Sequence, residues 1–385
     1  MIFKRKLYDK LLVWKQQTAG TKALLIEGAR RIGKSTLVEE FAKNEYRSYL
    51  MIDFNKVSDS VISAFNNYMN DLDTFFLILS SEYGVRLYPK ESIIIFDEIQ
   101  QFPKARQAIK YLVADGRFDY IETGSLISIK ENVNDITIPS EERTLLMYPM
   151  DFEEFAWAMN EEPLMAYIRQ CFDKKVPLEQ GIHAKAMLLF RQYMIVGGMP
   201  KSLSAYLENN RNFEMADMEK RDILTLYRND IKKIKSGYRS SVLSIFDQIP
   251  AFLSRSERRV VMNRIEKGAS FPKYHDTFFW LSDSMIANEC FNCSDPNVGL
   301  SLNEDRTYVK CYMGDTGLLI SHTFDENEIS DGELYREILL GKLSVNEGMF
   351  YENVIAQMLV AAGHKLYFYT RYNQEKHRND MEIDF

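Results

Sequence analysis

The chain has 385 residues, 46% of them hydrophobic, which predicts a globular protein of about two or three domains and excludes a disordered chain. Its net charge of −7 argues against attraction of the whole surface to nucleic acid, although segment 220–273 carries +8 and leaves −15 for the rest. Apolar runs such as 93–96 are too short to cross a bilayer. We therefore expect a cytoplasmic protein that does not enter a membrane.

The segment GARRIGKST, at 28–36, follows the apolar run KALLIE and satisfies the phosphate-loop pattern G-x-x-x-x-G-K-[ST]. Gly28 and Gly33 permit backbone conformations that a Cβ resists, so successive N–H groups can surround phosphates. Lys34, expected in an exposed loop, is placed for the β- and γ-phosphates, and Ser35 is the expected Mg²⁺ ligand. A glycine-rich turn before an ordinary helix is the alternative. The residues predicted to hold ATP here are Gly28, Ala29, Arg30, Arg31, Ile32, Gly33, Lys34, Ser35 and Thr36.

The strand predicted at the start of SIIIFDEIQ, 92–100, ends in two carboxylates. Asp97 can hold Mg²⁺ through water together with Ser35, and Glu98 can polarise the attacking water. An ordinary acidic strand end has the same appearance, but a phosphate loop upstream favours the functional interpretation. A helix over 35–43, a strand over 46–54 and a helix over 65–79 are predicted between the two motifs.

Two later positions are candidates for sensing or completing the site. The strand FDYIETGS, 118–125, should place Thr123 or Ser125 at the ligand-binding edge of a parallel sheet, where either could sense the γ-phosphate. Arg143 precedes the predicted short strand TLLMY. It is either an ordinary salt-bridging residue or an arginine finger for a neighbouring subunit, in which case the protein is a homo-oligomer.

These motifs resemble those of the prokaryotic AAA+-type ATP-binding proteins that carry a C-terminal domain of unknown function. Two further segments share the resemblance: PMDFEEF from position 149 and YMIVGGMPKSLSAYLE from position 193. The resemblance covers nearly the whole chain. It implies a P-loop ATPase followed by a winged helix and a domain related to PD-(D/E)xK nucleases. It also implies ATP as the nucleotide, since no guanine-reading N-K-x-D is found.

The basic part of the predicted winged helix is either a DNA-backbone face or the solvated side of a helix. Its basic residues are Arg255, Arg258, Arg259, Arg264 and Lys267. The pair Cys290 and Cys293 has the spacing of half a zinc site, but no second pair repeats it, so packed strand cysteines are expected.

Glu352 and Asp384 match two acidic positions of the nuclease-like family, where carboxylates hold a divalent metal. The E-x-K element of the next strand is absent, so we expect an incomplete domain, a truncated chain and no nuclease activity.

The overall prediction is a multidomain α/β protein: a P-loop AAA+-type parallel sheet, a helical lid, a winged helix and an incomplete α/β nuclease-like domain. The predicted ranges are 1–160, 161–235, 236–325 and 326–385. We expect Lys34, Ser35, Asp97 and Glu98 to hydrolyse ATP with Mg²⁺ as a conformational switch. A DNA-binding regulator with a slow nucleotide switch, and an ATP-controlled nuclease in the full-length protein, are the alternatives.

Overall fold

The computed structural model describes residues 1–125, 139–234, 237–255, 258–260, 271–297, 299–325, 332–341, 347–373 and 378–385. The chain divides into two compact units, Met1–Tyr148 and Pro149–Phe385. This division falls before position 160, where the first predicted range ends. Across the described ranges, no helix combines the length and the apolar character needed to cross a membrane.

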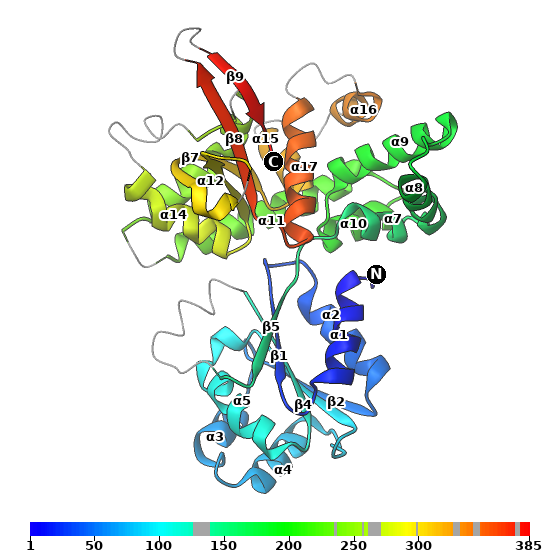
Figure 1. The fold of residues 1–385 in the computed structure, drawn as a ribbon. Helices are drawn as coiled ribbons and strands as arrows, with labels where there is room; N and C mark the ends of the chain where they lie inside the picture. The colour runs from blue at the N-terminus through cyan, green and yellow to red at the C-terminus, as the bar shows by residue number, and fades with distance from the viewer. Residues whose placement is uncertain are drawn as a thin grey trace. The chain divides into compact units, whose positions relative to one another are not determined.

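The first unit is built on a parallel five-stranded sheet in the order β2-β3-β4-β1-β5 (Figure 1). Buried apolar runs form its central strands, as expected for a parallel sheet that is covered on both faces. The strands are β1 Ala23–Glu27, β2 Ser48–Asp53, β3 Ser92–Asp97, β4 Asp119–Gly124 and β5 Glu142–Leu146. This architecture confirms the predicted α/β class.

Helices cover both faces of this sheet. One face packs against α3, α4 and α5 in an aromatic-rich core that includes Leu25, Phe65 and Phe96. Helices α1 and α2 lie on the other side of the sheet in Figure 1. The helices are α1 Lys6–Gln17, α2 Lys34–Glu45, α3 Asp59–Asn67, α4 Leu72–Tyr83, the 3-10 turn Ile99–Gln101 and α5 Pro103–Asp115.

The single helix predicted over 65–79 is wrong, because the chain breaks between α3 and α4. Asp71 caps α4 by accepting a hydrogen bond from the Thr74 backbone N–H, and so starts a new helix in place of continuing the first. Apolar periodicity alone does not reveal such a break, since both helices present apolar side chains to the same core.

The second unit begins with a run of helices and continues into a mixed sheet. Its helices are α7 Phe152–Ala158, α8 Glu162–Lys174, α9 Gln180–Val196, α10 Pro200–Glu208, α11 Phe213–Lys232, α12 Arg239–Leu253, α14 Phe271–Asp283, the 3-10 turn Leu300–Asn303, α15 Thr316–Thr323, α16 Gly332–Leu340 and α17 Glu347–Ala361. Residues 161–234 are mainly helical, and their assignment as a lid stays a prediction.

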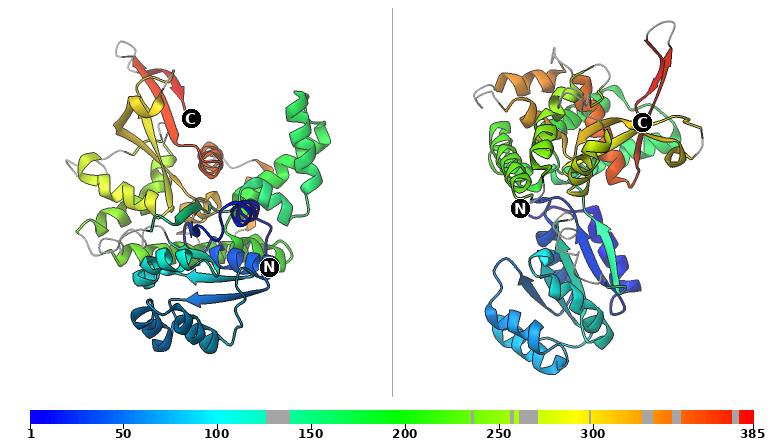
Figure 2. Two further views of the ribbon diagram at one scale, coloured as in Figure 1. Left: turned by 60° about the horizontal axis from the view of Figure 1, so that its bottom comes forward. Right: turned by 90° about the vertical axis from the view of Figure 1, so that its left-hand side faces the viewer.

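The mixed sheet has the strand order β7-β6-β8-β9. Its strands are β6 Ala287–Cys293, β7 Glu304–Met313, β8 Leu366–Asn373 and β9 Arg378–Ile383. β6 pairs antiparallel with β7 and parallel with β8, and β8 and β9 form the antiparallel pair that extends outward in Figure 2. Strands of the predicted winged helix and of the predicted nuclease-like range thus share one sheet.

A buried polar contact joins the GGMP segment at the end of α9 to the start of α15. Asp315 accepts hydrogen bonds from the backbone N–H groups of Gly198, at 2.6 Å, and Leu318, at 2.9 Å. The buried Lys220 ammonium donates to the carbonyl of Ile195 at 2.6 Å. A Cβ on Gly198 would lie 2.2 Å from the carbonyl oxygen of Met150. The glycines of this segment are therefore required for close approach of the backbone as well as for ending a helix.

We expect Gly198→Ala to lower the free energy of unfolding by about 2–4 kcal/mol, because the added methyl must displace backbone atoms of Met150. The matched control is Gly237→Ala, whose Cβ would meet no described atom within 4 Å. Denaturant unfolding of both variants checks this, and equal stability would show that the 150 and 198 segments are not packed together.

Candidate functional site

The parallel register brings the ends of three neighbouring strands to one edge of the first unit's sheet. Glu27 of β1 pairs with Gly124 of β4, and Phe96 of β3 pairs with Glu122 of β4. Three features therefore lie side by side at this edge: the loop at 28–33, Asp97 at the end of β3 with Glu98 after it, and Ser125 after β4. Ligands of open α/β sheets bind at this carboxyl edge.

The loop at 28–33 turns directly into α2, and its two glycines serve different purposes. Gly33 has φ +92°, a left-handed conformation that favours glycine. Gly28 has no such φ; a Cβ there would lie 2.4 Å from the carbonyl oxygen of Met147, just after β5. Gly28 thus permits close approach of two chain segments.

Lys34 is buried with 5% of its surface exposed, so the expectation of an exposed lysine is wrong. Its ammonium donates hydrogen bonds to the carbonyls of Gly28 and Ala29, both at 2.9 Å. Burial lowers the pKa of Lys34 to about 8, although Glu98 and Asp97 favour its charged form. A cation enclosed by the loop is well suited to meet an incoming anion.

Asp97 is the centre of the hydrogen bonds at this edge. Its Oδ1 accepts a hydrogen bond from Ser35 Oγ at 2.7 Å and a second, short one from Thr123 Oγ1. A carboxylate and a hydroxyl in direct contact form the oxygen donor set that Mg²⁺ prefers, so Ser35 and Asp97 fit the predicted metal. Thr123 is completely buried and holds Asp97.

Glu98 and Ser125 flank Asp97. Glu98 has φ +54°, which is uncommon outside glycine, and its backbone N–H lies 3.4 Å from Thr123 Oγ1. Its carboxylate accepts a hydrogen bond from Gln100. The buried Ser125 Oγ has no hydrogen-bond partner within the described ranges, so of the two hydroxyls proposed as sensors it is the one with unused capacity.

Arg5 is a residue of this site that sequence reasoning missed. Its guanidinium is buried and donates to the carbonyl of Ile32, at 3.0 Å, and to that of Tyr148, at 2.6 Å. It therefore ties the loop to the last residue of the first unit. A basic residue near the N-terminus is too common a feature to have pointed to this role.

Arg143 lies away from the loop within its own chain. It belongs to β5, which begins at Glu142, so the strand starts earlier than predicted. Arg143 pairs in register with Leu24 near the amino end of β1, whereas the loop follows the carboxyl end. The side chain is exposed, so a role toward a neighbouring subunit stays a prediction.

Several basic side chains of segment 220–273 have partners in their own unit. Lys220 is completely buried, and Arg259 donates to Thr370. The ion pairs are Arg221 with Asp217, Arg228 with Asp247, and Arg258 with Glu352. Arg264, Lys267 and the side chain of Lys273 lie outside the described residues. The segment thus presents less unpaired charge to DNA than its total of +8 indicates.

Glu352 of α17 and Asp384, which follows β9, lie on either side of a lysine. The buried Lys310 of β7 lies 3.3 Å from Glu352 and 2.9 Å from Asp384. Arg258 and Tyr312 also contact Glu352. The cations Lys310 and Arg258 thus lie against these carboxylates, and Lys310 also lies 3.7 Å from Glu382. The described residues include no group of three or more His, Cys, Asp or Glu side chains able to hold a metal. The arrangement therefore does not fit a divalent metal.

Cys290 and Cys293, the two cysteines with the spacing of half a zinc site, are free thiols buried in β6. Cys311 of β7 is also buried, in register with Glu289. These side chains are packed in the sheet, in agreement with the expectation of strand cysteines.

Three solved structures are similar to the chain over most of its length at low identity. AMPPCP-bound DnaA from Aquifex aeolicus is 10% identical, with a TM-score of 0.27, and the alignment covers 74% of this chain and 90% of that one. The Aeropyrum pernix ORC1 protein in complex with DNA is 10% identical, with a TM-score of 0.31 and coverages of 85% and 93%. The Thermotoga maritima RuvB Holliday junction branch migration motor is 12% identical, with a TM-score of 0.31 and coverages of 80% and 92%.

No curated protein matches the chain. Residues 187–328 match a family described as a domain of unknown function (DUF8612). Residues 20–156 match the family described as AAA domain. This match spans most of the first unit, and the loop geometry and the parallel strand order of that unit agree with it.

Proposed function

We propose that the chain binds ATP with Mg²⁺ at the carboxyl edge of the first unit's sheet and hydrolyses it as a conformational switch. The observation that carries this proposal is the contact of Asp97 with Ser35, beside the buried Lys34. It joins the two sequence motifs whose chemistry requires each other: a loop that holds phosphates and a carboxylate that holds the metal.

In this proposal the residues have separate roles. The backbone N–H groups of the loop and Lys34 bind the phosphates, and Ser35 and Asp97 hold Mg²⁺, which would supply charge neutralisation at the phosphates. Glu98 orients the attacking water and accepts its proton. Thr123 positions Asp97 and Glu98 through its hydroxyl, and Ser125 is the candidate γ-phosphate sensor.

Partners of the first unit are also proposals. A homo-oligomer would let the exposed Arg143 act on a neighbour's nucleotide. Action on DNA is the weaker proposal, because several basic residues of segment 220–273 pair within their own unit. Steady-state phosphate release with and without DNA distinguishes a DNA-stimulated ATPase from a slow nucleotide switch. Absence of nuclease activity in this chain stays a prediction, which plasmid incubation with Mg²⁺ or Mn²⁺ tests.

Glu98→Gln should lower ATP turnover by a factor on the order of a hundred or more while nucleotide binding persists, because Glu98 acts on water and not on the phosphates. Lys34→Ala is the matched variant that should lose tight triphosphate binding. Phosphate release and calorimetric titration with a non-hydrolysable analogue measure the two effects. Equal loss of binding in both variants would place Glu98 in a structural role.

Triphosphate affinity should fall as the pH rises above about 8, because the pKa of Lys34 is lowered to about 8 and the bound phosphates favour its charged form. Above this pH binding must take up a proton, so the dissociation constant should rise by up to about tenfold per pH unit. Calorimetry between about pH 7 and 9.5 measures this. Lys34→Arg, which keeps its charge, should show no such slope; a flat profile in the parent protein would contradict the proposed contact.

Turnover per subunit should rise with protein concentration if Arg143 completes a neighbour's site, and Arg143→Ala should remove that rise. Arg47→Ala is a suitable control, since Arg47 is an exposed arginine that precedes β2 at the other edge of the same sheet. Turnover that does not depend on concentration in the parent protein would make Arg143 an ordinary surface residue.

A further inference from the structure

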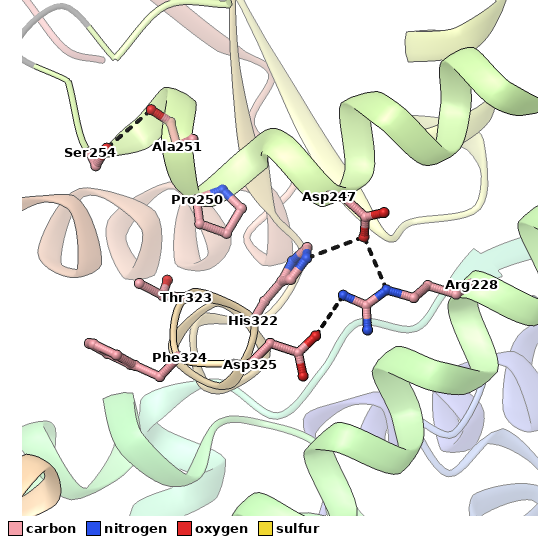
Figure 3. A pocket seen from close by; sticks show the side chains of 9 residues that line it. All are labelled: Arg228, Asp247, Pro250, Ala251, Ser254, His322, Thr323, Phe324 and Asp325. Carbon is pink, nitrogen blue, oxygen red and sulfur yellow. Dashed lines mark hydrogen bonds and ion pairs between the residues drawn. The ribbon is translucent and has the colours of Figure 1, made fainter. Parts of the chain in front are cut away.

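The second unit contains a pocket of about 590 Å³ between α11, α12 and the end of α15, which the proposed ATPase function does not use (Figure 3). Its charged and polar residues come from all three segments, and its apolar wall comes from α12 and from Phe324. The lining residues are Arg228, Asp247, Pro250, Ala251, Ser254, His322, Thr323, Phe324 and Asp325.

The single arginine of the lining lies between two carboxylates. Arg228 Nε donates to Asp247 at 3.0 Å, and one of its Nη groups donates to Asp325 at 2.8 Å. Burial opposes ionisation of Asp247, but contacts with His322 and Arg228 hold the pKa of its carboxyl below the ordinary value. The lining therefore holds two carboxyl groups and one guanidinium, and Arg221, from outside the lining, lies 3.6 Å from Asp325.

The two hydroxyl groups of the pocket lining, those of Ser254 and Thr323, both donate hydrogen bonds to backbone carbonyls. Ser254 Oγ donates to the carbonyl of Ala251 at 3.1 Å, and Thr323 Oγ1 donates to that of Leu319 at 2.7 Å. What each hydroxyl can still offer is a lone pair. The last turns of α12 and α15 also face the pocket, and the carboxyl end of a helix carries a partial negative charge. The pocket is thus rich in acceptors.

His322 adds a buried polar atom that is not satisfied. Its side chain is 3% exposed, its ring stacks on Phe246 with centroids 4.8 Å apart, and its Nε2 lies 3.6 Å from Asp247. Figure 3 shows the ring pointing from α15 toward Asp247 within the lining. Its Nδ1 has no hydrogen-bond partner in the part of the chain that the structure describes. A buried ring nitrogen without a partner is costly unless a ligand or water supplies one.

We propose that this pocket binds an organic cation, an ammonium or guanidinium group on a short apolar stem. The cationic head would donate hydrogen bonds to Asp247 and Asp325, whose side chains are 43% and 35% exposed and therefore accessible. The stem would lie on Pro250, Ala251 and Phe324. An anion is disfavoured because the guanidinium of Arg228 already donates to both carboxylates. The head group can belong to a small free amine or to a lysine or arginine side chain of another protein.

The test is calorimetric titration of the full chain with agmatine, which carries a guanidinium and an amine on an apolar stem. Ala251→Trp fills the apolar wall but leaves the ion pairs in place, so it should weaken agmatine binding by at least about tenfold. Asp247→Asn should weaken it as well. Asp230→Asn, which removes an α11 carboxylate that pairs with Lys233 outside the pocket, should leave the affinity within about twofold of the parent.

Citrate serves as the anionic control and should not bind. A blocked tripeptide with a central arginine distinguishes the sources: tighter binding of agmatine indicates a free small amine, and tighter binding of the peptide indicates a partner's side chain. Failure of both cations to bind, binding of citrate in their place, or unchanged agmatine affinity in Ala251→Trp would each overturn the proposal. None of these outcomes depends on ATP hydrolysis in the first unit.

Discussion

The carboxylate of Asp97 organises the candidate nucleotide site. It accepts hydrogen bonds from Ser35, the first hydroxyl of α2, and from Thr123 in β4, which lies between β1 and β3 in the sheet. These contacts exist only because three strands run parallel in one register and end together. If β3 shifted by one residue, every side chain of the strand would change faces, and Asp97 would leave the edge. Register is therefore the constraint on which the proposed chemistry depends.

The loop at 28–33 is also tied to the segment by which the chain leaves the first unit. The Met147 N–H donates to the carbonyl of Glu27 at 2.8 Å, and the Met147 carbonyl lies so close to Gly28 that no Cβ fits between them. Arg5 adds a bridge from Ile32 to Tyr148. The loop and residues 147–148 are therefore held by the same set of contacts.

In the second unit, buried cations hold together segments that are distant in sequence. Lys220 donates to the carbonyls of Ile195 and Gly317, and Lys310 contacts Glu352 and Asp384. An ammonium removed from water is tolerated only where acceptors surround it, so each lysine stabilises one particular arrangement of the chain around it. The same contacts bury the charges of Lys220 and Lys310 within the second unit and place Lys310 between the two nuclease-like carboxylates.

The sequence by itself was sufficient to predict the P-loop, the strand that ends at Asp97 and the α/β class. Each of these follows from contiguous residues whose backbone preferences and polarity are local properties. The break between α3 and α4 was missed because the periodicity is shared across it. Tertiary structure alone decided that Lys34 is buried, that Thr123 holds Asp97, that Arg5 supports the loop and that Lys310 lies between Glu352 and Asp384. The residues of these contacts are mostly far apart along the chain, up to the 143 positions that separate Arg5 from Tyr148. Only the folded backbone brings such side chains within hydrogen-bond distance, and the spacing of these residues along the chain does not reveal the contact.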